Sequence, residues 1–255
     1  MKNVWIIFRK ELKSYFASPI AYSIMALYAV VFGFLFYAAM RYAQQWSQRA
    51  AAMGGGYPMN INEMIVRPVL MNVSVIGLFL IPMITMRLFA EEKRSGTIEL
   101  LMTSPVRDLE LILGKYFAAL GLYAIILAVS AVNFTFLFLY GKPAPGPMLV
   151  GYLGLLLQGG CLLAIGTFLS TLTRNQIIAG AAGFCVGLLL WVLEWTTSFE
   201  SSAVSQVVSY LSVVAHFEPF SKGVLDTRDV VFFLSAIFLG LFLTARSMES
   251  LRWRA

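Results

Sequence analysis

The chain is poor in the residue types that most catalytic and metal sites require. It has one histidine, two cysteines and 13 acidic residues among 255. A zinc protease motif of the HExxH type needs two histidines, so that class of site is excluded. Cys161 and Cys185 both lie inside apolar runs, where we expect two small buried residues and no disulfide framework. These shortages weigh against an enzyme and predict no metal site.

A phosphate-binding loop is also missing. Gly114–Lys115 is followed by Tyr116 and lacks the upstream glycine of a Walker A motif. Gly141–Lys142 is followed by Pro143, which does not fit the motif either. We therefore expect that this chain does not hydrolyse ATP by itself and carries no cofactor of its own.

Charge is scarce as well. Only 13% of the residues are charged, 59% are hydrophobic, and the mean hydropathy is +0.78. Soluble domains carry about 25% charged residues. Several apolar runs reach the ~20 residues that span a bilayer, and unpaired backbone amides are not tolerated in lipid, so these runs must be helices. The sequence predicts one all-α integral membrane domain over residues 1–255, with six spans at about 20–40, 69–86, 116–140, 148–172, 177–195 and 230–245.

Lysine and arginine are distributed unevenly between the predicted loops. If the N-terminus lies inside, thirteen of the 19 basic residues fall on inner segments. Basic residues concentrate on the cytoplasmic side of membrane proteins. The pattern predicts a multi-pass protein of the cytoplasmic membrane with both termini in the cytoplasm. The net charge of +6 is explained by this bias, so no nucleic-acid partner is expected.

The inner segment RLFAEEKRSGTIELLMTSP, residues 87–105, has an unusual composition for this chain. Six of the thirteen residues from Arg87 to Glu99 are charged, and both signs occur. Gly96 interrupts the segment, Thr97 can cap a short helix that reaches about Thr103, and Pro105 sets its end. A solvated loop is one interpretation. The mixed charges and the short capped helix favour the other interpretation, which is a surface that docks a partner protein.

Two further segments have one-sided patterns. The N-terminal residues 4–16 place Trp5, Phe8, Leu12, Tyr15 and Phe16 on one face, apart from the basic residues, as in an amphipathic helix in the inner interface. The outer segment 196–228 has an apolar stripe that predicts a short amphipathic helix, either at the outer surface or re-entering the membrane. His216 lies in this segment and is expected to form hydrogen bonds rather than to act as a ligand or base.

The predicted spans contain few polar groups. Glu194 is the only ionisable residue within them, at an outer end, which weighs against an ion-coupled carrier. Asn133 and Gln158 are expected to form interhelical hydrogen bonds, with a substrate path as the alternative. Gly183 and Gly187 form a small-xxx-small pair that suits a helix–helix contact.

Three stretches together resemble a known family. RLFAEEKRSGTIELLMTSPV, residues 87–106, is similar to the inner motif of ABC type-2 permeases, which are the membrane subunits of bacterial ABC exporters. The six-span layout and the N-terminal stretch RKELKSYFASP, residues 9–19, fit that family too. The stretch HFEPFSKGVLDTRDVVFF, residues 216–233, resembles the outer segment of the gliding-motility (GldF-like) branch, which is related to the NosY-like permeases.

The resemblance implies a function and a set of site residues. Two permease subunits, identical or related, would pair in the bilayer. Each would dock an ATPase subunit that binds ATP and magnesium, and an auxiliary membrane protein is a further candidate partner. The residues implied in ATPase coupling are Arg87, Glu91, Glu92, Arg94, Gly96, Thr97, Glu99 and Pro105. Those implied in the N-terminal helix are Arg9, Lys10, Glu11 and Lys13, and those in the outer segment are His216, Phe217, Phe220, Gly223, Asp226 and Asp229.

Two other classes of function stay open. One is a membrane scaffold or assembly protein that only resembles a permease, and the other is a stand-alone lipid flippase or channel without an ATPase partner. The sequence does not identify a cargo. Spans without charge favour an amphipathic or lipid-like cargo over a small ion.

Overall fold

The computed structural model describes residues 2–53, 60–99, 106–141, 143–193 and 210–252. Within these residues the secondary structure is entirely helical. The elements are α1 (Lys2–Ala17), α2 (Pro19–Ala52), the π-helix η1 (Asn62–Val66), α3 (Arg67–Thr85), α4 (Ala90–Ser95), α6 (Asp108–Tyr140), α7 (Pro145–Leu172), α8 (Gln176–Val192), α10 (Val213–Ser221) and α11 (Thr227–Arg252). The predicted all-α class is therefore confirmed for the described residues.

The first long helix begins where the sequence predicts a start. The Ser18 hydroxyl accepts a hydrogen bond from the Ile20 amide at 3.4 Å, and Pro19 occupies the first helical turn. The helix continues to Ala52, well beyond the predicted end of the span near residue 40. An α-helix need not stop at a membrane surface, because its backbone hydrogen bonds are satisfied within the helix in water and in lipid alike.

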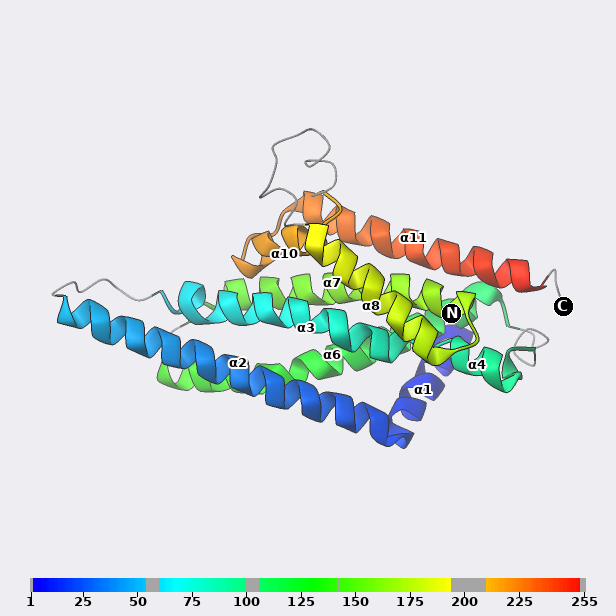
Figure 1. Cartoon of the computed structure of the whole chain (residues 1–255), viewed down its shortest axis with the longest axis horizontal. Coiled ribbons are helices and arrows are strands. Elements are labelled where there is room, and N and C mark those ends of the chain that lie inside the picture. The colour runs from blue at the N-terminus through cyan, green and yellow to red at the C-terminus, as the bar shows by residue number, and fades with distance from the viewer. Residues whose placement is uncertain (1, 54–59, 100–105, 142, 194–209, 253–255) are drawn as a thin grey trace.

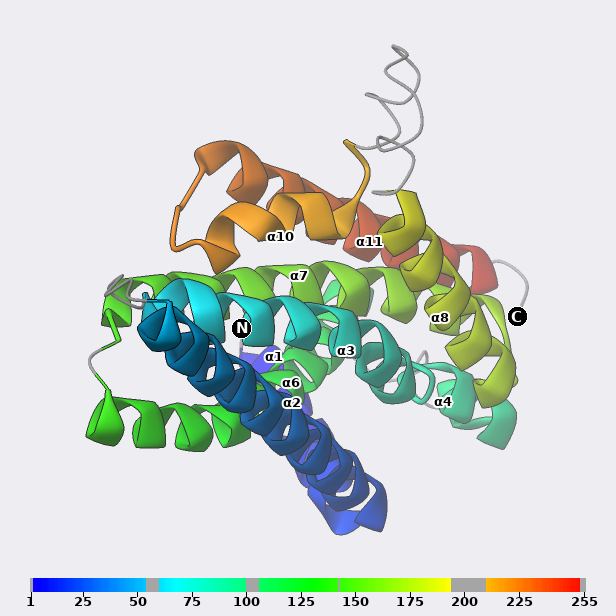
Figure 2. The ribbon, with the colours of Figure 1, turned by 60° about the vertical axis from the view of Figure 1, so that its left-hand side comes forward.

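The central helix of the bundle is α7, which contacts α3, α6, α8, α10 and α11. Figure 2 shows α10 and α11 on one side of α7, with α3 and α6 on the other. Its buried face carries small residues at which neighbouring helices approach closely. A Cβ atom on Gly154, for example, would lie 2.5 Å from Phe220 Cβ on α10. In lipid no hydrophobic effect drives helices together, so their association depends on close van der Waals packing, which small residues permit.

Two predictions on interhelical contacts are confirmed. The glycine face of α8 packs on α3, since a Cβ on Gly183 would lie 3.5 Å from Pro82 and one on Gly187 would lie 3.5 Å from Leu78. The Gln158 side-chain amide on α7 donates a hydrogen bond to the Ser74 carbonyl on α3 at 3.4 Å. Asn133 on α6 is half-buried and forms no such bond with the other described residues, so the corresponding prediction is not confirmed.

Five helices are long and apolar enough to cross a membrane, and they are built on α2, α3, α6, α7 and α11. The remaining predicted span, 177–195, corresponds to α8, a shorter apolar helix of 17 residues. Glu194, at the outer end of that predicted span, lies outside the described residues. The chain is thus a multi-pass membrane protein with five candidate spans, and the sixth span stays a prediction.

The two cysteines differ in their environments. Cys161 on α7 is buried, as predicted, but Cys185 on α8 is exposed and corrects the expectation that both are buried. The reason is the position of each helix. The central helix α7 is surrounded by neighbours, whereas α8 lies at the edge and turns only one face toward α3 and α7.

Candidate functional site

Three elements gather at one end of the bundle. Figure 1 shows α1, α4 and the C-terminal end of α11 at this end, which we call the α4 end. The charged segment that begins at Arg87 lies here, and so does the N-terminal helix with its basic residues. The two ends of the chain that the sequence places on the same side are therefore together.

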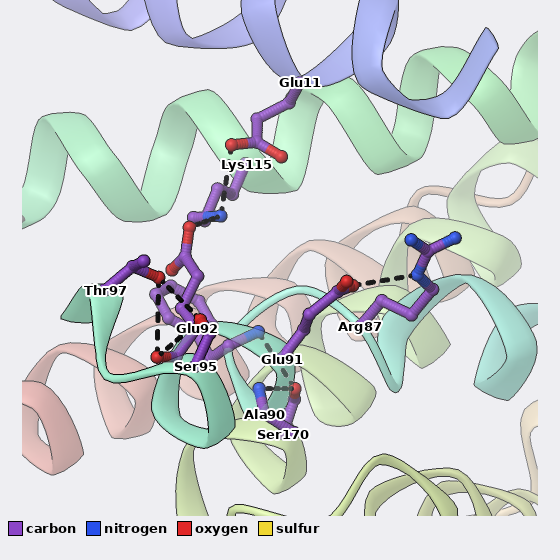
Figure 3. Close-up of polar contacts among 10 residues, drawn as sticks. Glu11, Arg87, Ala90, Glu91, Glu92, Ser95, Thr97, Lys115 and Ser170 are labelled. Carbon is purple, nitrogen blue, oxygen red and sulfur yellow. Dashed lines mark hydrogen bonds and ion pairs between the residues drawn. The ribbon is translucent and has the colours of Figure 1, made fainter. Parts of the chain in front are cut away.

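A side chain of α7 defines the start of α4. After α3 the backbone turns through residues 86–89, and the Ser170 hydroxyl oxygen accepts hydrogen bonds from the Phe89 and Ala90 amides, both at 3.1 Å. The first amides of a helix have no partner within the helix itself. Ser170 supplies that partner from a different helix, so it holds the first turn of α4 against α7 (Figure 3).

Gly96 ends α4 as the sequence predicts. Its φ of 74° is in the left-handed region, which glycine adopts without steric cost. Residues 97–99 are helical again, and the Thr97 hydroxyl lies 2.9 Å from Ser95 Oγ and 3.5 Å from the Glu92 carbonyl oxygen. The rest of the predicted short helix, with Pro105, lies outside the described residues.

The charges of α4 follow the helix dipole. Glu91 and Glu92 are in its first turn, and Lys93 and Arg94 are in its last turn. Glu91 Oε2 also forms an ion pair with Arg87 Nε at 2.9 Å, so the segment before α4 is tied to its first turn. Part of the segment after this pair faces outward, because four of its residues are exposed: Arg94, Gly96, Thr97 and Glu99.

A buried lysine joins three elements at the α4 end. Lys115 on α6 is 2% exposed, and its Nζ lies 2.7 Å from Glu92 Oε1 on α4 and 3.2 Å from Glu11 Oε1 on α1. The ammonium group also lies 5.4 Å from the centre of the Phe89 ring. Figure 3 shows Lys115 between the two carboxylates, which approach it from opposite sides. We call Glu11, Lys115 and Glu92 the ion triad.

The sequence predictions identify both carboxylates of the ion triad but not its lysine. Glu11 was expected on the N-terminal helix and Glu92 in the coupling segment, with no link between them. Lys115 is the only basic residue in α6, which is otherwise strongly apolar. That isolation is the signal that could have drawn attention to it, although it does not reveal the partners.

A second contact holds the last turn of α4. The Lys93 ammonium group donates a hydrogen bond to the Thr171 carbonyl at the end of α7. The Thr171 hydroxyl lies 2.8 Å from Ser247 Oγ on α11. The short helix α4 is therefore attached to α7 at both of its ends, through Ser170 and Thr171, in addition to the ion triad.

The N-terminal helix α1 packs along α6 with part of its apolar surface. Ile7, Leu12, Tyr15 and Phe16 pack against the apolar core, whereas Trp5 is 63% exposed and stacks on Phe8 with 5.0 Å between ring centres. The predicted position of this helix in the inner interface stays a prediction. Arg9, Lys10 and Lys13 are exposed, so a basic face remains available.

His216 is buried and forms hydrogen bonds with both ring nitrogens. Its Nδ1 lies 2.6 Å from Asp229 Oδ1 on α11, and its Nε2 lies 2.9 Å from the Tyr210 carbonyl oxygen. The ring stacks on Phe232 with 3.8 Å between ring centres. The expectation of a hydrogen-bonding histidine is confirmed, but its side chain lies within the bundle and not at its surface.

The other residues implied for the outer segment have structural positions. Phe217 and Phe220 are fully buried on α10, where both approach Gly154 of α7. Gly223 has a φ of 81° after the end of α10, and a Cβ there would lie 2.7 Å from Pro147. Asp226 Oδ1 accepts a hydrogen bond from the Arg228 amide at 2.9 Å, before the first turn of α11. Residues 194–209, which hold Val204, Val207 and Val208 of the predicted apolar stripe, lie outside the described residues.

Glu218 on α10 carries two ion pairs at the opposite end from α4. Its Oε1 lies 2.9 Å from Arg67 on α3 and 2.9 Å from Lys222. The hydrogen bond from Lys222 is the main reason that the pKa of Glu218 lies below its ordinary value, and Arg67 contributes in the same direction. The pair with Arg67 links α10 to the start of α3.

An apolar groove lies between the second half of α6 and the first half of α7. Its volume is about 420 Å³, and no charged residue lines it. Elsewhere, among the residues that the structure describes, no group of three or more histidine, cysteine or acidic side chains could hold a metal ion.

The fold and these surfaces define a class of protein. Its described residues form an all-helical, multi-pass membrane protein with a charged, partly exposed surface at one end and no candidate metal-binding group among them. The chain matches the ABC-2 family transporter protein over residues 5–243, and it therefore belongs to that family. No curated protein matches the chain. ABC-2 members are membrane permeases that lack ATPase activity of their own and pair with an ABC ATPase.

Proposed function

We propose that this chain is the permease subunit of a bacterial ABC exporter, driven by ATP hydrolysis on a separate ATPase subunit. The exposed part of the segment from Arg87 to Glu99 and the basic face of α1 form the surface that docks the ATPase. ATP and magnesium are bound by the ATPase and not by this chain. Two permease copies, or this chain and a related one, pair in the bilayer.

The observation that carries the proposal is the juxtaposition of these two surfaces. A solvated loop would have no reason to be anchored, yet α4 is attached to α7 through Ser170 and to α1 and α6 through Lys115. The anchoring leaves Arg94 and Thr97 of the same segment exposed. A rigidly held surface of mixed charge is suited to selecting and orienting a protein partner.

The proposed topology places the α4 end in the cytoplasm. Both termini then lie on the cytoplasmic side, α8 completes a set of six spans, and α10 with the residues before it forms an outer segment that shapes the exit. Thirteen basic residues on the inner segments support this orientation. The stretch from His216 to Phe233 supports assignment to the GldF-like branch, for which an auxiliary membrane protein is a candidate partner.

One observation favours a lipid-like cargo. The groove between α6 and α7 is apolar along its lining and offers no charged side chain to a polar solute. A flippase that works without an ATPase would share these features, as would a membrane scaffold that transports nothing. Dependence on an ATPase is therefore the property that separates the proposed function from both alternatives.

The docking surface also suggests which residues to change. Glu92 is buried in the ion triad and Glu91 is paired with Arg87, so alanine at these positions would disturb the permease itself. Arg94 is exposed on α4 and has no such role. Its charge reversal, Arg94→Glu, alters the proposed contact surface alone. Arg49→Glu is a matched control, because Arg49 is also exposed but lies near the far end of α2.

The test is co-expression with the ATPase encoded beside this chain, followed by co-purification in detergent and an assay of permease-dependent ATP hydrolysis. We expect wild type and Arg49→Glu to form an active complex. Reversing a charge at such a surface sets like charges against each other, and a loss of about 1.4 kcal/mol is tenfold in affinity, so Arg94→Glu should need about tenfold more ATPase for half-saturation. Equal half-saturation for both variants would exclude α4 from the interface, and no complex with wild type would favour the two alternatives.

A further inference from the structure

We propose that Lys115 is a positioning residue that ties α1 and α4 to α6, so that a displacement imposed on the docking surface is passed to α6. The inference rests on the proposed function for its consequence in transport. The tie itself is a property of this chain and can be measured without any ATPase.

The geometry of the ion triad carries the argument. One ammonium group bonds carboxylates from two helices that are separated from it by long stretches of sequence, Glu11 at 3.2 Å and Glu92 at 2.7 Å. Lys115 is 2% exposed, so water does not compete for these bonds as it does at a surface pair. Neither carboxylate can move away from α6 without leaving the lysine with one partner fewer.

A purely structural role explains this arrangement poorly. Buried ion pairs contribute little net stability, because desolvation of the charges offsets their attraction, and apolar residues of similar volume often serve as well. Here the two carboxylates share one cation, and Glu92 Oε2 is buried without a hydrogen-bond partner among the described residues. What the ion triad does supply is a defined geometry between three helices.

The other attachments of α4 bind it to α7. Ser170 accepts neutral hydrogen bonds from two backbone amides at the start of α4, and the half-buried Lys93 ammonium group donates one to the Thr171 carbonyl. Hydrogen bonds with an ionised partner are roughly twice as strong as neutral ones, and water competes less for the buried Lys115 than for Lys93. When α4 is displaced, the contacts with α7 are expected to break first, while the ion triad keeps α4 and α1 with α6. Motion at the docking surface would then reach the bundle along α6, the helix that also forms one wall of the apolar groove.

The first measurement is a distance. Nitroxide labels at Lys13→Cys on α1 and Ser95→Cys on α4, both exposed positions, are placed in a Cys185→Ser background because Cys185 is exposed and Cys161 is buried. Pulsed electron resonance on the full chain in nanodiscs gives the distribution of distances between the labels. We expect a narrow distribution in the parent, a similar one for Lys115→Arg, and a clearly broader one for Lys115→Met.

The second measurement separates coupling from docking in the reconstituted complex with the ATPase. We expect Lys115→Met to lower the maximal rate of permease-dependent ATP hydrolysis by about tenfold. The ATPase concentration that gives half of the maximal rate should change by no more than about twofold. Lys115→Arg should retain activity, since it keeps the charge. A change that weakened only the docking surface would do the opposite and raise half-saturation at unchanged maximal rate.

A variant in which the ion triad carries no charge is the control for misfolding. Lys115→Met leaves two buried carboxylates unpaired, which destabilises a protein strongly. The triple variant Glu11→Gln, Lys115→Met and Glu92→Gln removes all three charges and should recover the thermal stability. We expect its maximal hydrolysis to stay low and its label distances to stay broad, because stability is restored but the tie is not.

The outcomes divide cleanly. An unchanged distance distribution in Lys115→Met, or full hydrolysis in the neutral triple variant, would overturn the inference. If Lys115→Met raised only the ATPase concentration needed for half-saturation and left the maximal hydrolysis rate unchanged, the inference would be overturned as well. If wild type itself shows no permease-dependent hydrolysis, the proposed function fails, and the distance distributions alone then decide whether Lys115 holds α1 and α4 together.

Discussion

At the scale of single residues, three polar side chains buried in this apolar chain each have hydrogen-bond or ion-pair partners. Burying a polar group is costly unless it is hydrogen-bonded, and burying a charge costs more. Gln158 bonds a backbone carbonyl, Lys115 bonds two carboxylates, and both ring nitrogens of His216 face acceptors.

Glu218 leads to a prediction about pH. Its folded pKa is lowered, mainly by the hydrogen bond from Lys222, so its ion pairs add stability above the unfolded pKa, and this contribution is lost as the pH falls through the folded value. We expect wild type to be more stable than Glu218→Gln near neutral pH and the difference to vanish in the acidic range. Thermal unfolding of both proteins in detergent at a series of pH values measures this. A stability difference that does not depend on pH would contradict it.

At the scale of elements, α1 is a helix packed on another helix and not only a helix on a lipid surface. Its contact with α6 is close around Gly114, where a Cβ atom would lie 2.7 Å from Ile7 Cβ and 3.2 Å from the Val4 carbonyl oxygen. The Asn3 side chain adds a hydrogen bond to Glu110 at 3.0 Å. The basic face of α1 is thus held at a defined angle to α6, as a docking surface requires.

The close approach at Gly114 predicts the effect of a larger side chain. Gly114→Leu should push α1 away from α6, and overpacking of this kind costs about 1–3 kcal/mol. Amide hydrogen exchange across α1 should therefore become about tenfold faster while exchange in α7 stays unchanged. Gly33→Leu on α2 is the matched control, because nothing lies within 4 Å of a Cβ at that position. If α1 exchanges equally fast in both variants, the packing of α1 on α6 is not what protects it.

At the scale of the whole molecule, the open question is whether α8 crosses the membrane. Five helices are long and apolar enough to cross a membrane, whereas α8 has only 17 residues and a typical span has about 20. In Figure 1, α8 runs obliquely from the α4 end toward α10. Whether α8 crosses the membrane decides on which side of the membrane α11 ends.

Labelling with a membrane-impermeant maleimide shows whether α8 crosses the membrane, because it reports the side on which each cysteine lies. Single cysteines are placed at Lys13, Met53 and Ser250 in the Cys185→Ser background, since all three positions are exposed. We expect Met53→Cys to react in intact cells, and Lys13→Cys and Ser250→Cys to react only after the membrane is opened. This result requires an even number of crossings between Lys13 and Ser250. Reaction of Ser250→Cys in intact cells would mean that α8 does not span the membrane.

The sequence by itself determined the class of the molecule and the places where its helices break. Long apolar runs, the scarcity of charge and the bias of basic residues are local or additive properties, so they predict helices, spans and sidedness without knowledge of contacts. The left-handed turn at Gly96 follows in the same way from the residue itself.

Only the tertiary structure decided which residues meet. Lys115 lies 104 positions from Glu11, and Ser170 lies 81 positions from the amide of Phe89 that it caps. Periodicity cannot reveal such pairs, because it describes the faces of one helix and not what lies opposite. For the same reason the partner of His216 was not predicted. Helix packing in lipid depends on shape and on buried polar contacts between helices, and these exist only once the bundle is assembled.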